Sequence, residues 1–303
     1  MAKPGKPDAQ QEFFGGAWTQ EKLAKVQKYL SAYIAIFTKN PAARHFRTTY
    51  VDAFAGTGYM AEAEALHRPV ASFFPELAEL APNAGEYAKG SAVRALDLDP
   101  GFDTYLFIEA DVERAKELNR LKSEFPDKAD RIEVVNADAN AYLSKWCEQT
   151  DWKKNRAVVF LDPFGMQVEW QLIDKIATTQ AIDLWLLFPL FAINRLLVRY
   201  GKPPAGWAKR LTVTLGTDEW EKEFYNTQKS SLIEGLEFTS KVADLRKISD
   251  YFVQRLRSIF AAVPDPLVLM NSRGAPLYLL CFAAGNPRGA PTALRIAKHI
   301  LEN

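Results

Sequence analysis

Short apolar runs alternate with helical patterns through the first two thirds of the chain. The expected strands cover residues 48–54, 104–110, 131–137, 156–162 and 181–188, and the expected helices between them cover 111–125, 139–149 and 169–180. Near-continuous apolar strands that alternate with helices predict a mainly parallel sheet with helices on both faces. Two later runs, 266–270 and 276–285, flank a turn-like segment and predict an antiparallel pair that closes the sheet. The pattern therefore favours an α/β, Rossmann-like fold of about seven strands, ended by a helix over 292–301.

A further helix is predicted before this alternation, over residues 19–37. Apolar side chains recur there at helical spacing: Leu23, Val26, Leu30, Tyr33, Ile34 and Phe37. Lys22, Lys25 and Lys28 lie largely off that stripe. We expect a packing helix with a solvated lysine face in preference to an arm that binds nucleic acid.

The domain organisation follows from two departures from the alternation. Residues 1–16 are polar and predict a disordered tail, and residues 17–303 predict a single domain. Insertions are expected at about 59–89 and at about 190–241, the second mostly helical and loop-like. Both follow predicted strands, so both are expected beside the carboxyl ends of the sheet.

Composition narrows the class of protein. The chain has 303 residues and a formal net charge of +1, so any contact with nucleic acid requires a local basic patch. Cys147 and Cys281 lie far apart and match no metal-binding spacing, so no metal site is expected. The N-terminus lacks the apolar run of a signal peptide, and no run reaches membrane-spanning length. We expect a cytoplasmic protein with no membrane segment and no disulfide framework.

The first candidate binding motif closes the first predicted strand. Asp52 is followed by Phe54, Gly56 and Gly58 in the segment VDAFAGTG. Glycines at this place let the backbone turn tightly and approach a ligand. Glycine turns also end many strands without binding anything, so it is the position in the first strand–helix unit that indicates a nucleotide-type ligand.

Acids also close the next predicted strands. Glu109 ends the second strand, where an acid commonly accepts hydrogen bonds from ribose hydroxyls. Asp138 ends the third strand, where it could accept a hydrogen bond from an adenine amino group while the backbone at Ala139 binds a ring nitrogen. Each acid has a simpler interpretation, as a solvated strand end for Glu109 or a helix N-cap for Asp138. Asp111 is predicted to cap the helix that follows Glu109.

The ligand class follows from these acids together with Asp162 at the fourth strand end. Carboxyl ends of parallel strands converge on one crevice, and a ligand with an ammonium group, a ribose and an adenine would suit four acids there. The chain contains neither a G-x-x-x-x-G-K-[ST] phosphate loop nor a complete G-x-G-x-x-G. S-adenosylmethionine, which has no phosphate, is therefore the predicted cofactor.

The candidate catalytic motif is Asp162-Pro163-Phe164-Gly165. An exocyclic amine on a base is a poor nucleophile, and a carboxylate or carbonyl that accepts its hydrogen bond relieves the charge that develops during methyl transfer. Pro163 would fix the backbone that aims Asp162, and Phe164 could stack on a flipped base. The simpler interpretation is a strand-ending turn with Phe164 packed in the core.

A basic segment in the second insertion is the candidate contact for nucleic acid. Arg195, Arg199 and Lys202 occur without an intervening acid, together with Trp207. Basic side chains can meet phosphates and aromatic rings can stack on unpaired bases. A solvated, flexible insertion would have the same composition.

Several of these motifs, taken in order, resemble one protein family. The segments are YVDAFAGTG, KGSAVRAL, LFIEAD, LDPFGMQVEW, IDLWLLFPL and YLLCFAAGNPRG. Over about residues 50–299 the chain resembles the three-Cys-motif partner proteins. That resemblance implies a fold similar to S-adenosylmethionine-dependent methyltransferases and a separate partner protein with three cysteines. The LDPFG segment alone also resembles the tRNA guanine-N2 dimethyltransferases.

The expected function is methyl transfer from S-adenosylmethionine to an amino group of an RNA or DNA base. Two alternatives stay open. One is a methyltransferase for small molecules, and the other is a non-catalytic subunit that keeps the fold and works through its three-cysteine partner.

Overall fold

A computed structural model describes residues 16–59, 89–229, 237–271 and 273–303. The predicted tail, except its last residue, lies outside this range. So does the first predicted insertion between residues 60 and 88.

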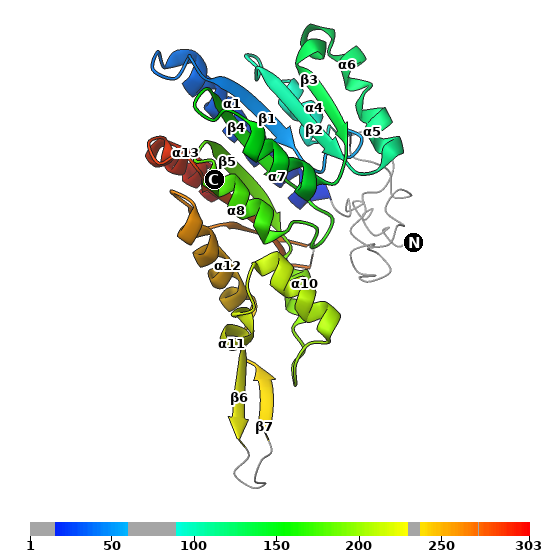
Figure 1. The fold of residues 1–303 in the computed structure, drawn as a ribbon, viewed down its shortest axis with the longest axis vertical. Coiled ribbons are helices and arrows are strands. Elements are labelled where there is room, and N and C mark those ends of the chain that lie inside the picture. Colours follow the sequence, from blue (N-terminus) through cyan, green and yellow to red (C-terminus); the bar gives the residue numbers. More distant parts are fainter. Residues whose placement is uncertain (1–15, 60–88, 230–236, 272) are drawn as a thin grey trace, which may run out of the picture.

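The central sheet has seven strands in the order β3-β2-β1-β4-β5-β9-β8 (Figure 1). The strands are β1 (Arg47–Asp52), β2 (Thr104–Glu109), β3 (Ile132–Asn136), β4 (Asn155–Leu161), β5 (Ile182–Phe188), β8 (Leu267–Met270) and β9 (Pro276–Ala284). The first five run parallel, and β9 pairs antiparallel with both β5 and β8. The predicted Rossmann-like α/β fold, closed by an antiparallel pair, is confirmed.

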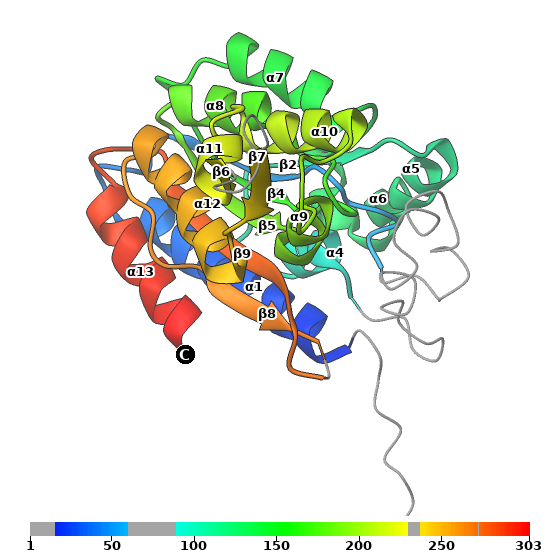
Figure 2. The same ribbon diagram turned by 90° about the horizontal axis from the view of Figure 1, so that it is seen from below.

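Helices cover both faces of this sheet, which gives three layers (Figure 2). Alternate residues of each strand point into the cores on opposite faces of the sheet. Val51 lies in the core that contains α7 (Ala139–Gln149), α8 (Trp170–Thr178) and α12 (Leu245–Ile259). Its neighbour Tyr50 packs on the other face, in the core that contains α1 (Gly16–Lys39), α4 (Ser91–Leu96) and α13 (Ala290–Glu302). Burial on both faces explains why the strands are almost continuously apolar.

Two helical segments differ from the sequence-based expectation. The helix expected over 111–125 is divided into α5 (Val112–Leu118) and α6 (Leu121–Glu124), followed by a 3-10 turn over Pro126–Arg131. At the break, the Asn119 side chain donates to the carbonyl oxygen of Ala115 at 3.1 Å and so competes with the backbone ladder. Helix α12 is absent from the expected elements, although its apolar residues follow a helical stripe.

The expected lysine face of the first helix is wrong for two of its three members. Lys22 and Lys25 are 4% and 8% exposed, whereas Lys28 is exposed. Lys25 Nζ donates to the carbonyl oxygen of Ile300 at the end of α13, at 2.9 Å. Helix α1 lies on the sheet between α13 and α4, so a lysine on its flank meets protein instead of water.

The second insertion contains a strand pair that was not expected. It includes α9 (Leu190–Leu196), α10 (Ala205–Leu215), α11 (Trp220–Phe224) and the antiparallel strands β6 (Tyr225–Lys229) and β7 (Glu237–Lys241). The β6–β7 pair extends away from the body of the molecule (Figure 1). Among the described residues, no helix is both long and apolar enough to cross a membrane.

Candidate functional site

The candidate site lies where the strand order reverses. Strands β1 and β4 are neighbours, but the chain leaves β1 toward β2 and β3 and leaves β4 toward β5. Connections therefore depart to opposite sides, and the crevice at the carboxyl ends of β1 and β4 is where open α/β sheets bind ligands.

The glycine turn after β1 has the backbone geometry that the sequence predicts. Gly56 has φ +61° and Gly58 has φ +85°, both in the left-handed region. A Cβ on Gly56 would meet none of the described residues within 4 Å, whereas a Cβ on Gly58 would meet Leu121 at 3.0 Å. The segment that leads into α4 packs against the turn from the other side, because Gly90 N donates to the carbonyl oxygen of Gly58 at 3.0 Å.

Asp52 is a fully buried carboxylate at the end of β1. One oxygen accepts a long hydrogen bond from the backbone N–H of Phe54 at 3.4 Å, and the Ser91 side chain also bonds to this carboxyl. The Oδ2 atom is buried and has no hydrogen-bond partner within 3.5 Å in the described part of the chain, and the buried Tyr50 hydroxyl, which also lacks a partner at that distance, lies near this carboxyl. The pKa of Asp52 is raised to about 7, mainly by burial and also by the nearby charge of Asp162, against the opposing effect of the Ser91 hydrogen bond.

Glu109, at the end of β2, is 5% exposed and holds the glycine turn in place. Its carboxylate accepts from the backbone N–H of Gly56 at 3.0 Å and of Asp111 at 2.8 Å. It also forms an ion pair with Arg114 at 2.9 Å. The simpler interpretation of Glu109 as a solvated strand end is therefore wrong. Its carboxylate joins the glycine turn to the start of α5.

The predicted N-cap roles are present. Asp111 Oδ1 accepts from the backbone of Glu113 and Arg114 at the start of α5, which confirms that prediction. Asp138 caps α7 by accepting from Ala141 N at 2.9 Å; it remains exposed, while Ala139 is buried. Its adenine role stays a prediction.

Asp162 forms an ion pair that the sequence did not reveal. Lys22 Nζ lies 2.5 Å from Asp162 Oδ2, with side-chain exposures of 4% for the lysine and 23% for the aspartate. The ammonium group also lies 5.2 Å from the ring centroid of Trp18, which stacks on Tyr278 of β9 at 5.1 Å. Helix α1 therefore places a cation at the carboxyl end of β4. The sequence contained one indication that Lys22 is buried: it shares a helical face with the apolar residues Val26 and Tyr29.

The loop after Asp162 projects one aromatic ring into solvent. Pro163 is buried, but the Phe164 side chain is 49% exposed, so the expected alternative of a core-packed ring is wrong. Gln167 Oε1 accepts from Phe164 N at 3.0 Å, and Gly165 has φ +73°, which together shape the turn.

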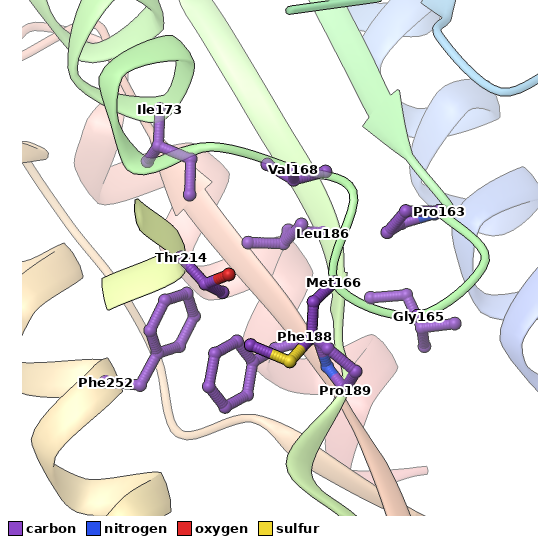
Figure 3. A pocket seen from close by; sticks show the side chains of 11 residues that line it. Pro163, Gly165, Met166, Val168, Ile173, Leu186, Phe188, Pro189, Thr214 and Phe252 are labelled. Carbon is purple, nitrogen blue, oxygen red and sulfur yellow. The ribbon is translucent and has the colours of Figure 1, made fainter. Parts of the chain in front are cut away.

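Two small pockets adjoin this loop, and both are bounded by Gly165 and Pro189. The first is mostly apolar and lies between the loop, the end of β5 and helix α12 (Figure 3). Thr214 of α10 is buried there, its hydroxyl lacks a partner among the described residues, and its oxygen points toward the interior of the pocket (Figure 3). The second pocket lies against Tyr278 and Phe191.

The predicted substrate residues are all exposed and lie in the second insertion. Arg195 lies 5.8 Å from the Phe191 ring, Arg199 lies 5.4 Å from the Tyr200 ring, and Lys202 pairs with Glu221 at 3.2 Å. Trp207 is 42% exposed on α10. The insertion contacts the candidate site directly, because Arg210 donates to the carbonyl oxygen of Met166 at 3.4 Å. Within the described ranges, no group of three or more His, Cys, Asp or Glu residues could hold a metal ion.

The comparisons with known proteins found solved structures of low similarity to this chain. No protein-family profile matches the chain, and no curated protein matches it. Protein LPL1258 of Legionella pneumophila is 13% identical over 96% of this chain and 92% of its own, with a TM-score of 0.46. The magnesium protoporphyrin IX methyltransferase of Synechocystis PCC 6803, solved with bound SAH, is 11% identical over 92% and 89%, with a TM-score of 0.37. An S-adenosylmethionine-dependent methyltransferase of Clostridium acetobutylicum is 11% identical over 88% and 96%, with a TM-score of 0.33.

Proposed function

We propose that this chain is an S-adenosylmethionine-dependent methyltransferase that acts on an amino group of a nucleic-acid base. The observation that carries the proposal is the buried carboxylate of Asp52, whose Oδ2 has no partner among the described residues. A buried, unsatisfied carboxylate is costly unless a ligand completes it. The methionine ammonium group of the cofactor is a donor of the required charge.

The neighbouring residues fit the rest of that cofactor. The open side of Gly56 allows close approach of a ligand to the backbone. Glu109 and Asp138, at the next two strand ends, are the proposed partners of the ribose and the adenine, with Phe54 and Ala139 beside them. When bound, the cofactor would supply a methyl group on a positively charged sulfur. The Asp52 carboxyl, whose Oδ2 has no partner among the described residues, would pair with such a cation.

Asp162 is the proposed catalytic acceptor. Its side chain, or the carbonyl that Pro163 holds in place, would accept a hydrogen bond from the amine during transfer. Lys22 is the proposed positioning residue, since its ammonium group lies 2.5 Å from Asp162 Oδ2 and fixes the orientation of that carboxylate. The exposed ring of Phe164 would stack on the acceptor base. Arg195, Arg199, Lys202 and Trp207 would meet the flanking nucleic acid.

One observation favours a second candidate function. Glu109 and Asp162 both already have partners from their own chain. A binding subunit that keeps the fold, and acts with a partner protein bearing three cysteines, needs no free carboxylate at either place. The partner and a cytoplasmic location both belong to this proposal.

Calorimetry with S-adenosylmethionine and S-adenosylhomocysteine on the full chain tests the first step. Transfer of tritium from methyl-labelled cofactor to mixed RNA, to DNA and to neither then separates the candidates. Binding followed by labelled nucleic acid supports the proposal. If the chain binds the cofactor but transfers no methyl group, even after addition of the partner, the binding-subunit function remains. If it does not bind the cofactor, both the cofactor assignment and the enzyme function are excluded.

A further inference from the structure

The projecting strand pair is extended by a third segment. The backbone of Gly201 donates to the carbonyl oxygen of Thr239 at 2.8 Å, and Lys241 N donates to the carbonyl oxygen of Arg199 at 3.0 Å. Tyr200 is thereby bridged to Ser240. Residues 199–201, β7 and β6 therefore form a three-stranded ribbon with β7 at its centre.

The register divides the ribbon into two faces. One face turns toward the body: Tyr225 donates to the carbonyl oxygen of Val198 at 3.0 Å, and Lys241, directly opposite Tyr225, donates to Asn194. Alternation along β7 then places Phe238 and Ser240 on the opposite face. Tyr200 lies across from Ser240, so it shares that face.

The outward face combines two exposed aromatic rings with polar side chains. Tyr200 is 71% and Phe238 is 58% exposed. They are diagonal neighbours on one face, within reach of a common ligand. The partners across the strands complete the face: Asn226, Gln228 and Ser240. We call these five residues the aromatic face.

Cations adjoin the aromatic face. The Arg199 guanidinium lies 5.4 Å from the Tyr200 ring. Lys202 lies two residues beyond Tyr200. Its side chain is 74% exposed and forms an ion pair with Glu221 at 3.2 Å. Lys209 and Arg210 follow on α10, and Arg210 reaches the loop of Asp162. These cations therefore occur along the segment of chain that joins the ribbon to the loop of the candidate site.

We propose that the aromatic face binds an unpaired stretch of nucleic acid. Small sheets that bind RNA stack two or three bases on exposed aromatic side chains, and every base offers a ring for such stacking. Amides such as Asn226 and Gln228 can bond base edges, and Arg199 can meet a phosphate beside a stacked base. A protein partner would need a more continuous apolar surface. This inference rests on the proposed function in one respect: both take nucleic acid as the substrate.

Fluorescence anisotropy with a fluorescein-labelled 12-nucleotide single strand, as RNA and as DNA, tests the proposal against the matched duplex. The parent protein is expected to prefer the single strand. The double variant Tyr200→Ala/Phe238→Ala is expected to bind it about 10- to 100-fold more weakly, because two stacking rings are lost. Tyr200→Phe/Phe238→Tyr keeps both rings and is expected to stay within about twofold.

Controls separate this proposal from folding and from the cofactor site. Met270→Ala removes another exposed apolar side chain, on β8 and outside the ribbon, and is expected to leave the affinity for the single strand unchanged. The affinity for S-adenosylmethionine is expected to be the same in every ribbon variant. Equal affinity of parent and double-alanine variant for the strand would overturn the proposal. So would preference for the duplex, or self-association that the double variant abolishes while strand binding persists. A parent that binds the strand but not the cofactor supports the ribbon and contradicts the proposed function.

Discussion

The central sheet buries one aspartate at the amino ends of its parallel strands and another at their carboxyl ends. The two acids differ in how completely their oxygens are hydrogen-bonded. Asp183 lies near the amino end of β5; Tyr29 donates to one of its oxygens at 2.6 Å and Gly285 N donates to the other at 3.3 Å. Asp52 lies at the carboxyl end of β1, and its Oδ2 has no partner among the described residues.

Burial alone therefore does not distinguish a structural acid from a binding one. Burial is the largest cause of a raised pKa in both, to about 6 for Asp183 and to about 7 for Asp52. What differs is the hydrogen-bond inventory. The complete set around Asp183 joins α1 and the end of β9 to β5, whereas the set around Asp52 leaves Oδ2 without a partner among the described residues.

The largest expected effect is on methyl transfer. Asp162→Ala, at the carboxyl edge, should lower the rate of transfer to nucleic acid by about 100- to 1000-fold, because it removes the acceptor of the amine hydrogen bond. Cofactor affinity should stay within a few fold. Asp183→Asn is the control at the other edge and should transfer at the parent rate. Parallel loss of transfer and cofactor binding in Asp162→Ala would indicate a purely structural aspartate.

The next effect separates the two buried acids directly. Asp52→Asn should weaken S-adenosylmethionine binding by about 10- to 100-fold in calorimetry, since a charged hydrogen bond to the ammonium group is lost. Asp183→Asn should leave the dissociation constant unchanged. Equal effects of both substitutions would show that completeness of hydrogen bonding does not mark the binding acid.

Removal of the Lys22 ammonium group should lower the stability of the folded protein. Lys22→Met leaves Asp162 unpaired and should lower the free energy of unfolding by about 2 kcal/mol, below the range for fully buried pairs because Asp162 is 23% exposed. Lys22→Arg keeps the charge and should recover part of that loss. Denaturant titration measures both, and unchanged stability of Lys22→Met would mean that the pair contributes nothing.

The smallest effect is a pH dependence. Only ionised Asp52 attracts an ammonium group, so with a pKa of about 7 the affinity for S-adenosylmethionine should rise about tenfold from about pH 5.5 to pH 7. The folded-state pKa lies above the ordinary 3.8, so Asp52 favours the folded state at low pH and this contribution is lost as pH rises through about 7. Asp52→Asn should remove most of both dependences. A pH-independent affinity in the parent would contradict the raised pKa or the ammonium contact.

Most of the fold could be predicted because its determinants are local. Apolar runs marked every strand of the central sheet, and helix α7 begins and ends where its pattern predicts. The β6–β7 pair escaped prediction because YNTQK and EFTSK are short, mostly polar strands on a projecting ribbon, whose inner face is only partly buried and does not impose an apolar alternation. The candidate acids were found at the strand ends, since a strand ends where its apolar run ends.

The sequence by itself determined which residues stand at the carboxyl edge: Asp52, the two glycines, Glu109, Asp138 and Asp162 each follow a recognisable strand. Only the tertiary structure decided which of these acids are satisfied. Lys22 reaches Asp162 across 140 positions of sequence, and Gly56 reaches Glu109 across 53. Hydrogen bonds act over about 3 Å, whereas sequence patterns report only neighbours along the chain. The partners of a buried charge are therefore set by how α1 and the glycine turn pack on the sheet.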